Sequence, residues 1–414
     1  MKLLKTLLAS CLAFALISAA SAQTTIRITG SMAFRAAVLT SIQNTLAAGY
    51  VYGYNGTSFT GSSQAIFTGN TKSGSIPVII KTSFSGSVGG ISTLAANLTI
   101  GTGGTFTGGG GWLVNSTPQS TTGTPNAPAN YDSPVTADIA MADCYQVSAP
   151  TKFRTPALKN NNVGVVDFEW ILTPGAAALG AISTSTNLTS AQVSGCFQTA
   201  TLKLSGLSGN SGDTEAVRGV GRDADSGTRI QALACSGISA GAEGELMQYQ
   251  PLFDGNKVAM QPPPIPGHQI TGAALWPKQT LNTINYEVGA SGYNSGGLVA
   301  AAVVVPHSGS FPTYKPWILS YLGINDASHV TDGTALKFNG VAFSTANVEN
   351  GTYLYWGNEH LFYRNSLSGN TLTYAGLLVT DVTKVTASIS GVAYSTMKVH
   401  REKDGGTIST GGTP

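Results

Sequence analysis

The stretch RDADSGTR, at residues 222–229, places two acids and two arginines around a bare Ser-Gly-Thr. Only 10% of the chain is charged, so four charges within eight residues require an explanation. A helix that begins at this point would leave backbone N–H groups unpaired and would carry a partial positive charge at its start. Glycine would let an oxyanion approach the backbone, and the two hydroxyls would add donors. The stretch could therefore bind an anion.

Two earlier loops have a similar composition. TGSMAFR at 29–35 and FSGSVGG at 84–90 also place small or hydroxyl residues directly before a helical pattern. One such loop is usually an ordinary helix cap, but three in one chain, one of them beside an arginine, favour an anion site. Asp143 follows the strand-like run ADIAMAD at 137–143 and is either a helix cap or part of this site.

The other charges of the 222–229 stretch have less specific explanations. Asp223 and Asp225 are either solvated loop charges or acids that hold Arg222 in place. Arg229 is expected to face solvent, one turn into the helix. The aromatic residues gathered at 353–363 are expected to pack in a core or on a sheet rather than to form a ligand cage.

Strand-like and helical patterns alternate along the chain, which predicts an α/β fold. The long apolar runs at 163–172 and 315–327 are expected to be strands that pass from one domain to a second domain and back. The Gly/Thr-rich segment 99–135 is expected to be a surface insertion or a flexible loop. The polar segment 401–414 is expected to be a flexible tail.

The first 22 residues have the pattern of a secretory signal. Lys2 and Lys5 precede a short apolar run that ends in Ala20-Ser21-Ala22, which predicts cleavage near Ala22-Gln23 and a periplasmic or extracellular location. A lipidation site at Cys11 is the less favoured alternative. No later segment offers an unbroken apolar run long enough to span a membrane.

The composition excludes several classes of partner and cofactor. The formal net charge of +2 falls to about zero without Lys2 and Lys5, which argues against binding nucleic acid or an acidic membrane surface. The histidines are scattered singly, and no spacing of His and Cys suggests a metal site, so we expect neither a metal nor a cofactor. Cys196 could pair with Cys235, or these two and Cys144 could all be buried thiols.

The order of these motifs resembles that of the periplasmic phosphate-binding proteins that serve ABC importers, within the type 2 periplasmic-binding-protein fold. The resemblance extends over most of residues 24–380, and RDADSGTR is its most specific element. It implies a two-lobed α/β fold, with residues 23–165 and 318–400 in the first lobe and residues 166–317 in the second. The Gly/Thr-rich segment would be an insertion in the first lobe. It also implies phosphate or a related oxyanion as the ligand, an ABC permease as the only link to a membrane, and a monomer.

The same resemblance implies a binding site formed by both lobes. Arg222 would pair with the anion, helix starts would donate backbone N–H groups and hydroxyls, and Asp143 would accept a hydrogen bond from a protonated oxyanion. Two small residues depart from the family pattern, because Ala33 and Ala142 stand where family members carry hydroxyls. The implied ligand-binding residues are Ser31, Phe34, Ser87, Asp143, Arg222, Ser226, Gly227 and Thr228.

Catalytic motifs are weak in this sequence. GISAG at 237–241 matches the G-x-S-x-G nucleophile pattern, but in a chain so rich in Gly and Ser such a match arises readily by chance. No histidine is placed by the sequence to serve Ser239, and no phosphate-binding Walker loop occurs. We therefore expect a binding protein and no enzyme, with a surface or structural protein that retains the fold as the alternative.

Overall fold

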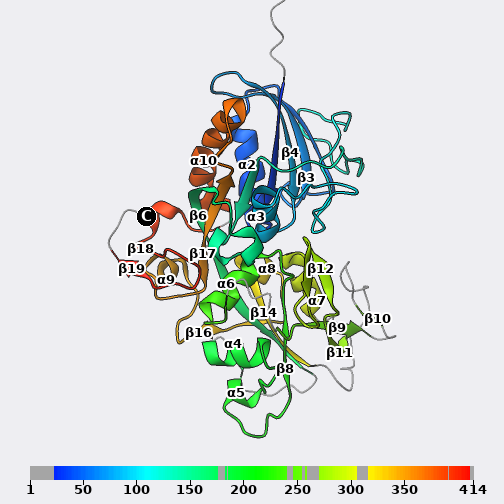
Figure 1. Ribbon diagram of the computed structural model, residues 1–414. Coiled ribbons are helices and arrows are strands. Elements are labelled where there is room, and N and C mark those ends of the chain that lie inside the picture. The colour runs from blue at the N-terminus through cyan, green and yellow to red at the C-terminus, as the bar shows by residue number, and fades with distance from the viewer. Residues whose placement is uncertain are drawn as a thin grey trace, which may run out of the picture.

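The computed structural model describes residues 23–175, 182–183, 185–239, 246–253, 257–258, 270–304, 316–389 and 391–410. One large mixed sheet runs through the molecule, with strands in the order β2-β3-β4-β1-β5-β17-β6-β14-β8 and with β15 beside β6. Helices pack on this sheet, and two bodies lie one above the other in Figure 1. The predicted α/β class and two-lobed architecture are confirmed.

The first lobe is organised around parallel strands, each followed by a loop that leads toward the second lobe. Strand β1 pairs in parallel with β4 on one side and with β5 on the other. Helix α10 packs along α2, whose residues Ala37, Leu39 and Ile42 are buried. The elements are β1 (Thr24–Gly30), α2 (Arg35–Thr45), β2 (Val51–Tyr54), β3 (Gln64–Asn70), β4 (Pro77–Phe84), α3 (Ser87–Ala95), β5 (Ile139–Ala142) and α10 (Gly369–Ile389).

The second lobe contains the other strand-to-helix unit of the sequence, β8 followed by α6. Strand β8 pairs in parallel with β14, and its neighbours are short helices and a small antiparallel sheet. The principal elements are β7 (Asn187–Leu188), α4 (Ser190–Phe197), α5 (Ser205–Ser208), β8 (Val217–Val220), α6 (Gly227–Cys235), β9 (Tyr249–Phe253), β10 (Lys257–Val258), β11 (Ile270–Leu275), β12 (Gln279–Leu281), β13 (Ile284–Tyr286), α7 (Gly296–Val303) and β14 (Trp317–Gly323).

A single long strand, β6 (Lys159–Thr173), joins the two lobes. Its first half pairs with β17 (Trp356–Tyr363), and its second half pairs with β14. The run 163–172 thus forms a strand that pairs with strands on both sides, whereas its passage between domains and the lobe boundaries at 166 and 317 stay predictions. The remaining elements are η1 (Gln146–Ser148), η2 (Thr151–Phe153), α8 (Ile324–Ala327), β15 (Thr334–Ala335), β16 (Lys337–Phe338), α9 (Thr345–Glu349), η3 (Tyr394–Thr396), β18 (Val399–His400) and β19 (Ser409–Thr410).

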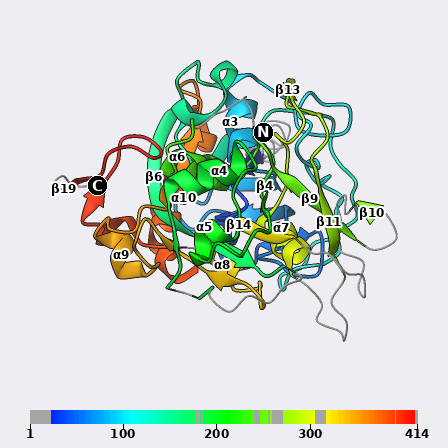
Figure 2. The ribbon, with the colours of Figure 1, turned by 90° about the horizontal axis from the view of Figure 1, so that it is seen from below.

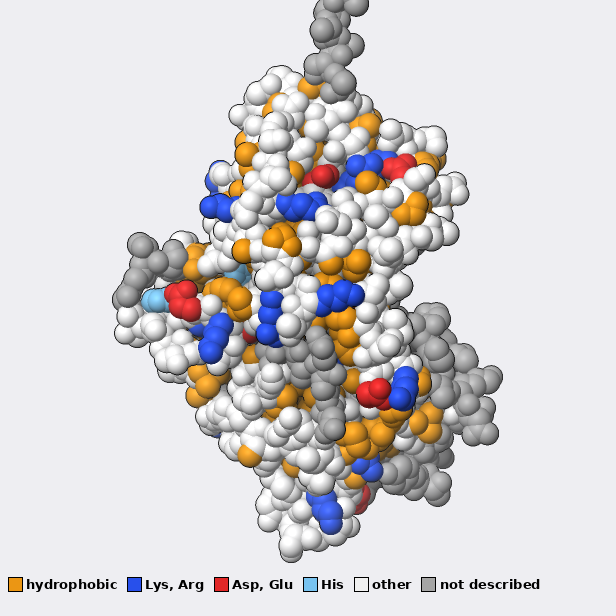
Figure 3. Space-filling view, viewed as in Figure 1, with side chains coloured by type: hydrophobic (Ala, Val, Ile, Leu, Met, Phe, Trp, Pro, Cys, Tyr) orange, Lys and Arg blue, Asp and Glu red, His pale blue; other side chains and the backbone are white. Residues whose placement is uncertain are grey.

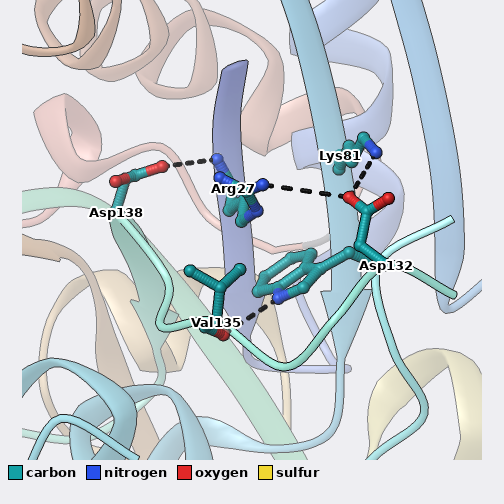
Figure 4. Close-up of polar contacts among 6 residues, drawn as sticks. Arg27, Lys81, Asp132, Val135 and Asp138 are labelled. Atoms are coloured by element: carbon teal, nitrogen blue, oxygen red, sulfur yellow. Dashed lines mark hydrogen bonds and ion pairs between the residues drawn. The ribbon is translucent and has the colours of Figure 1, made fainter. Parts of the chain in front are cut away.

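The Gly/Thr-rich insertion, residues 99–135, is anchored on the sheet of the first lobe. Arg27 on β1 and Lys81 on β4 lie opposite one another in register, and both reach Asp132 of the insertion, at 3.8 and 2.6 Å (Figure 4). Trp112 is fully buried and donates its indole N–H to the carbonyl oxygen of Val135 at 3.1 Å. A buried tryptophan and the ion pairs of Asp132 thus fix this segment on the sheet, although its low complexity is typical of flexible loops.

The end of the described chain packs against the body of the molecule. Strands β18 and β19 pair beside α9 (Figures 1 and 2). Arg401 lies over the ring of Trp356, 3.8 Å from its centroid, and donates to the carbonyl oxygen of Leu354. Residues 401–410, for which we expected flexibility, therefore contribute two buried side chains, Arg401 and Asp404.

Two further expectations concern the interior. Cys144, Cys196 and Cys235 are all free thiols, so the pairing of Cys196 with Cys235 was wrong. The aromatic residues at 353–363 are mostly buried and pack against neighbouring rings, such as Tyr355 against Phe168 and Trp170, as expected. On the face shown in Figure 3, charged side chains are few and scattered, which agrees with the low charge of the sequence.

Candidate functional site

Three loops of the first lobe meet where β1, β4 and β5 end, because the carboxyl ends of neighbouring parallel strands share one edge of the sheet. Ser31 donates its backbone N–H to the carbonyl oxygen of Met141 at 2.8 Å, and Gly86 donates to the carbonyl oxygen of Gly30 at 3.0 Å. Gly30 has φ of +113°, and a Cβ there would overlap the backbone of Met141. This close approach requires glycine and sets the position of Asp143, two residues beyond Met141.

Asp143 lies at a contact between the two lobes. Its carboxylate accepts a hydrogen bond from the hydroxyl of Ser87 at the start of α3, and a second one, at 3.2 Å, from the hydroxyl of Thr228 at the start of α6. A Cβ on Gly227 would overlap both this carboxylate and the Ser87 hydroxyl. The N-terminal ends of two helices, one from each lobe, therefore converge on a single acidic group. We call these four residues the Asp143 junction.

Asp143 is only 1% exposed, and burial raises the pKa of its carboxyl. The Ser87 hydroxyl, the nearby Arg222 and the Thr228 hydroxyl oppose this shift because they favour the charged form. Helix α6 begins at Gly227, and Ser226 caps it by accepting the N–H of Arg229 at 3.2 Å. The free N–H groups of this first turn give the carboxylate a favourable helix-end environment.

Arg222 lies at the end of β8 and directs two of its donors to its own lobe. Its Nε donates to the carbonyl oxygen of Tyr293 at 3.2 Å, and its Nη2 donates to that of Asn294 at 2.8 Å. Its positive charge nevertheless opposes the rise that burial causes in the pKa of the Asp143 and Asp326 carboxyls. These two hydrogen bonds hold the guanidinium in one position. From there its positive charge favours the ionised form of the Asp143 carboxyl.

The acids of the RDADSGTR stretch are structural. Asp223 and Asp225 are 5% and 2% exposed, so the solvated alternative was wrong, and burial raises the pKa of both carboxyls. The backbone oxygen of Asp225 accepts the N–H of Val88 from the first lobe at 2.9 Å. Arg229 is 3% exposed and donates to the carbonyl oxygen of Ala290 at 2.6 Å, so the expectation that it faces solvent was also wrong.

Ser31 and Phe34 lie in the loop after β1, next to the junction. The backbone N–H of Phe34, which the resemblance implies as a donor to the anion, donates to the Ser31 hydroxyl oxygen at 3.3 Å. The Phe34 ring is fully buried in the core. The structure therefore brings Ser87, Asp143, Gly227 and Thr228 into direct contact, with Ser226 and the charge of Arg222 close by, whereas the N–H of Phe34 bonds to Ser31 within its own loop.

Sequence reasoning missed a second layer of contacts beneath the junction. Gln231 donates from Nε2 to the backbone oxygen of Asp143 at 2.8 Å and to the Asp404 carboxylate at 2.5 Å. Asp404 also accepts the backbone N–H of Tyr145 at 2.8 Å. Gln231 lies four residues after Gly227 and so on the same helical face, which the sequence could have revealed. Asp404 lies 173 residues further along the chain and carried no such signal.

The insertion also bridges the lobes. Thr107 and Asn282 exchange two hydrogen bonds, at 3.1 Å from the N–H of Thr107 and at 2.7 Å from the N–H of Asn282. Asn282 in turn donates to the Asp225 carboxylate at 2.5 Å. A cavity of about 250 Å³ lies beside this Thr107–Asn282 contact and is lined in part by Asp223 and Trp276. The junction is thus flanked by interlobe contacts on the side of the insertion as well as on the side of Asp404.

In the part of the chain that the structure describes, no three or more His, Cys, Asp and Glu side chains are grouped so as to hold a metal ion. None of the helices within the described ranges combines the length and the apolar character that crossing a membrane would require.

Comparison with known proteins shows similarity in the path of the backbone and very little in sequence. No family model matches the sequence, and no curated protein matches it. A structure from Clostridium perfringens, named as a phosphate ABC transporter substrate-binding protein and solved with bound phosphate, is 12% identical, with a TM-score of 0.46 over 89% of this chain and 100% of that one. An ABC-type phosphate transport receptor from Vibrio cholerae is 14% identical, with a TM-score of 0.44 over 88% and 97% of the two chains. OxyR of Corynebacterium glutamicum is 11% identical, with a TM-score of 0.36 over 94% and 74%.

Proposed function

We propose that this chain is an exported binding protein that takes up a small oxyanion, most specifically phosphate, at the Asp143 junction. One observation carries the proposal: hydroxyls at the starts of α3 and α6, one helix from each lobe, both donate to a single buried negative group. Converging helix N-termini with hydroxyl donors are suited to an anion. Arg222 supplies a fixed positive charge nearby.

The contacts of Asp143 define how a guest would bind. Gly227 touches the carboxylate directly, so a guest fits between the lobes only after they separate. The hydroxyls of Ser87 and Thr228 would then turn from Asp143 to the oxyanion. An ionised Asp143 can only accept hydrogen bonds, so it favours an oxyanion that still carries a proton. At neutral pH phosphate carries one and sulfate does not, which predicts selection for phosphate.

Thermal unfolding with and without ligand tests the proposal. Phosphate at 100 times its dissociation constant should raise the free energy of unfolding by about 2.7 kcal/mol, whereas sulfate should have no effect. Asp143→Asn should admit sulfate, because an amide can donate to an unprotonated oxygen. Arg218→Lys, which changes a guanidinium that lies 4.8 Å from the Tyr249 ring centroid, serves as the control and should retain the phosphate response. No phosphate response in the wild-type protein would contradict the proposal.

A second candidate function is that of a surface or structural protein that retains the fold without binding. It is favoured by the interlobe contacts on both sides of the junction, Thr107 with Asn282 and Gln231 with Asp404, which oppose opening. This candidate predicts the same radius of gyration in X-ray scattering with and without phosphate. A binding protein that opens should instead become more compact when phosphate is added.

Location, partner and assembly belong to the same proposal. The N-terminal pattern supports export to the periplasm or the outside of the cell. Delivery of the ligand to an ABC permease would be the only link to a membrane, with a monomer as the delivering species and with no enzymatic step. Purification from the native host should recover a monomer that begins near Gln23, as mass spectrometry and gel filtration can show.

A further inference from the structure

A second cavity lies beside β6, the strand that joins the two lobes. Its volume is about 280 Å³, and its walls come from both lobes. Ala33, before α2, and Ile389, at the end of α10, belong to the first lobe. Ile324 and Asp326 follow β14, which pairs with β8 of the second lobe. We call it the hinge cavity.

The distinctive group in this cavity is Asp167, on β6. It is 8% exposed, lines the cavity, and none of the hydrogen bonds found among the described residues reaches its side chain from another residue. No Lys, Arg or His in the described part of the chain forms an ion pair with it. Burial and the negative charge of Asp167 both raise the pKa of Glu169, two residues further along β6. A carboxylate in such surroundings lacks the positive partner that buried acids usually have.

The other carboxylate of the cavity is different. Asp326 faces positive charge, because Arg222 and Arg35 both act on its carboxyl group. Its side chain also lies against the start of α7, where a Cβ on Gly296 would overlap it. Positive groups of the protein therefore offset part of the cost of burying Asp326, whereas no positive group among the described residues is found to do so for Asp167.

We infer that the hinge cavity binds a small organic cation, a primary ammonium group with a short apolar body. The ammonium would lie at Asp167, and the apolar body would lie against Ile324, Phe343 and Ile389. A divalent metal fits less well, because among the described residues no three or more His, Cys, Asp and Glu side chains are grouped to hold one. The volume is at the lower end of that of small-molecule pockets, which limits the guest to a few heavy atoms.

Such a guest would act on both lobes at once. It would contact the hinge strand, the end of α10 and the segment after β14, so it would stabilise the arrangement of lobes seen here. This site is separate from the oxyanion site, since none of the four residues of the Asp143 junction lines the hinge cavity. The two proposals can therefore fail separately.

Titration calorimetry with n-butylammonium tests the inference, with n-butanol and butyrate as neutral and anionic probes of similar size. Saturable binding of the ammonium alone is expected. Asp167→Asn should weaken it at least tenfold, whereas Glu402→Gln, which removes a carboxylate whose side chain is 90% exposed, should leave it unchanged. Thermal unfolding of both variants establishes that they are folded.

Three results would overturn the inference. They are no binding of n-butylammonium by the wild-type protein, equal binding of n-butanol, and unchanged affinity in folded Asp167→Asn. Phe343→Ala provides a second variant, because loss of the apolar wall should also weaken binding, in contrast to Glu402→Gln. A phosphate response that persists in Asp167→Asn, measured as above, would show that the oxyanion site is unaffected.

Discussion

Asp143 and Asp167 are both buried carboxylates close to the boundary between the lobes, yet their surroundings are opposite. Asp143 accepts two hydroxyl hydrogen bonds, lies at a helix start and has no space beside it. Asp167 accepts no hydrogen bond from another side chain of the described residues and lines a cavity of about 280 Å³. The first acid is held by the protein, and the second is left for a partner that the protein does not supply.

The difference shows that burial alone does not define the role of an acid. Burial disfavours the charged form at both positions and raises the pKa of both carboxyls. At Asp143 the hydroxyls and Arg222 offset part of that cost, whereas at Asp167 nothing among the described residues beyond its own backbone is found to offset it. A buried acid with few partners lowers the free energy of unfolding when it is ionised. Substitution of Asp167 therefore tests the difference between the two acids.

The largest expected effect is a pH-dependent cost at Asp167. Burial raises the pKa of this carboxyl from 3.8 to about 6, so between these values the folded state binds more protons than the unfolded state. Stability should therefore fall as pH rises from about 4 to 6, and then stay constant, by about 3 kcal/mol for a shift of ~2 units. Asp167→Asn removes this cost and should raise the unfolding temperature at pH 7.5 far more than at pH 4.

Chemical denaturation at these two pH values measures the effect. Glu402→Gln is the control, since its exposed side chain should change stability little at either pH. Asp404 has a pKa that burial also raises to about 6, so the wild-type curve contains more than one group. The difference between the wild-type and Asp167→Asn curves isolates Asp167. Equal stabilisation by the variant at pH 4 and at pH 7.5 would show that this carboxylate is not strained by burial.

The next effect concerns the tight contact at the Asp143 junction. In Gly227→Ala the added Cβ would overlap the Asp143 carboxylate and the Ser87 hydroxyl, both from the opposite lobe. We expect a loss of about 2 kcal/mol in the free energy of unfolding, as for other overpacked sites. Gly376→Ala, on the exposed side of α10 with open space around it, should instead stabilise by about 0.5–1 kcal/mol. A neutral Gly227→Ala would show that the junction is open in solution.

The contrast between the two acids also marks what the sequence could predict. Asp143, Ser87 and Gly227 were found because each follows a strand in a strand-to-helix unit, and parallel strands bring such loops to one edge. Asp167 was not found, because it lies inside the apolar run 163–172 and its cavity forms only when 323–326, Phe343, Thr345 and 387–389 pack around it. The direction of the Arg222 donors likewise depends on carbonyls some 70 residues away.

The smallest expected effect is the loss of a hydroxyl that donates a hydrogen bond, compared with the loss of one for which no hydrogen bond is found among the described residues. Thr228→Val removes the 3.2 Å hydrogen bond to Asp143 and leaves a buried carboxylate oxygen without this donor, which should cost about 1 kcal/mol. Thr345→Val is the matched change at the hinge cavity, where no side-chain hydrogen bond of Thr345 is found among the described residues. It should alter stability by less than about 0.5 kcal/mol. Urea unfolding of both variants at pH 7.5 resolves the difference. Equal losses would mean that the Thr228 hydroxyl does not hold Asp143, and the Asp143 junction would then depend on the Ser87 hydroxyl and the helix start alone.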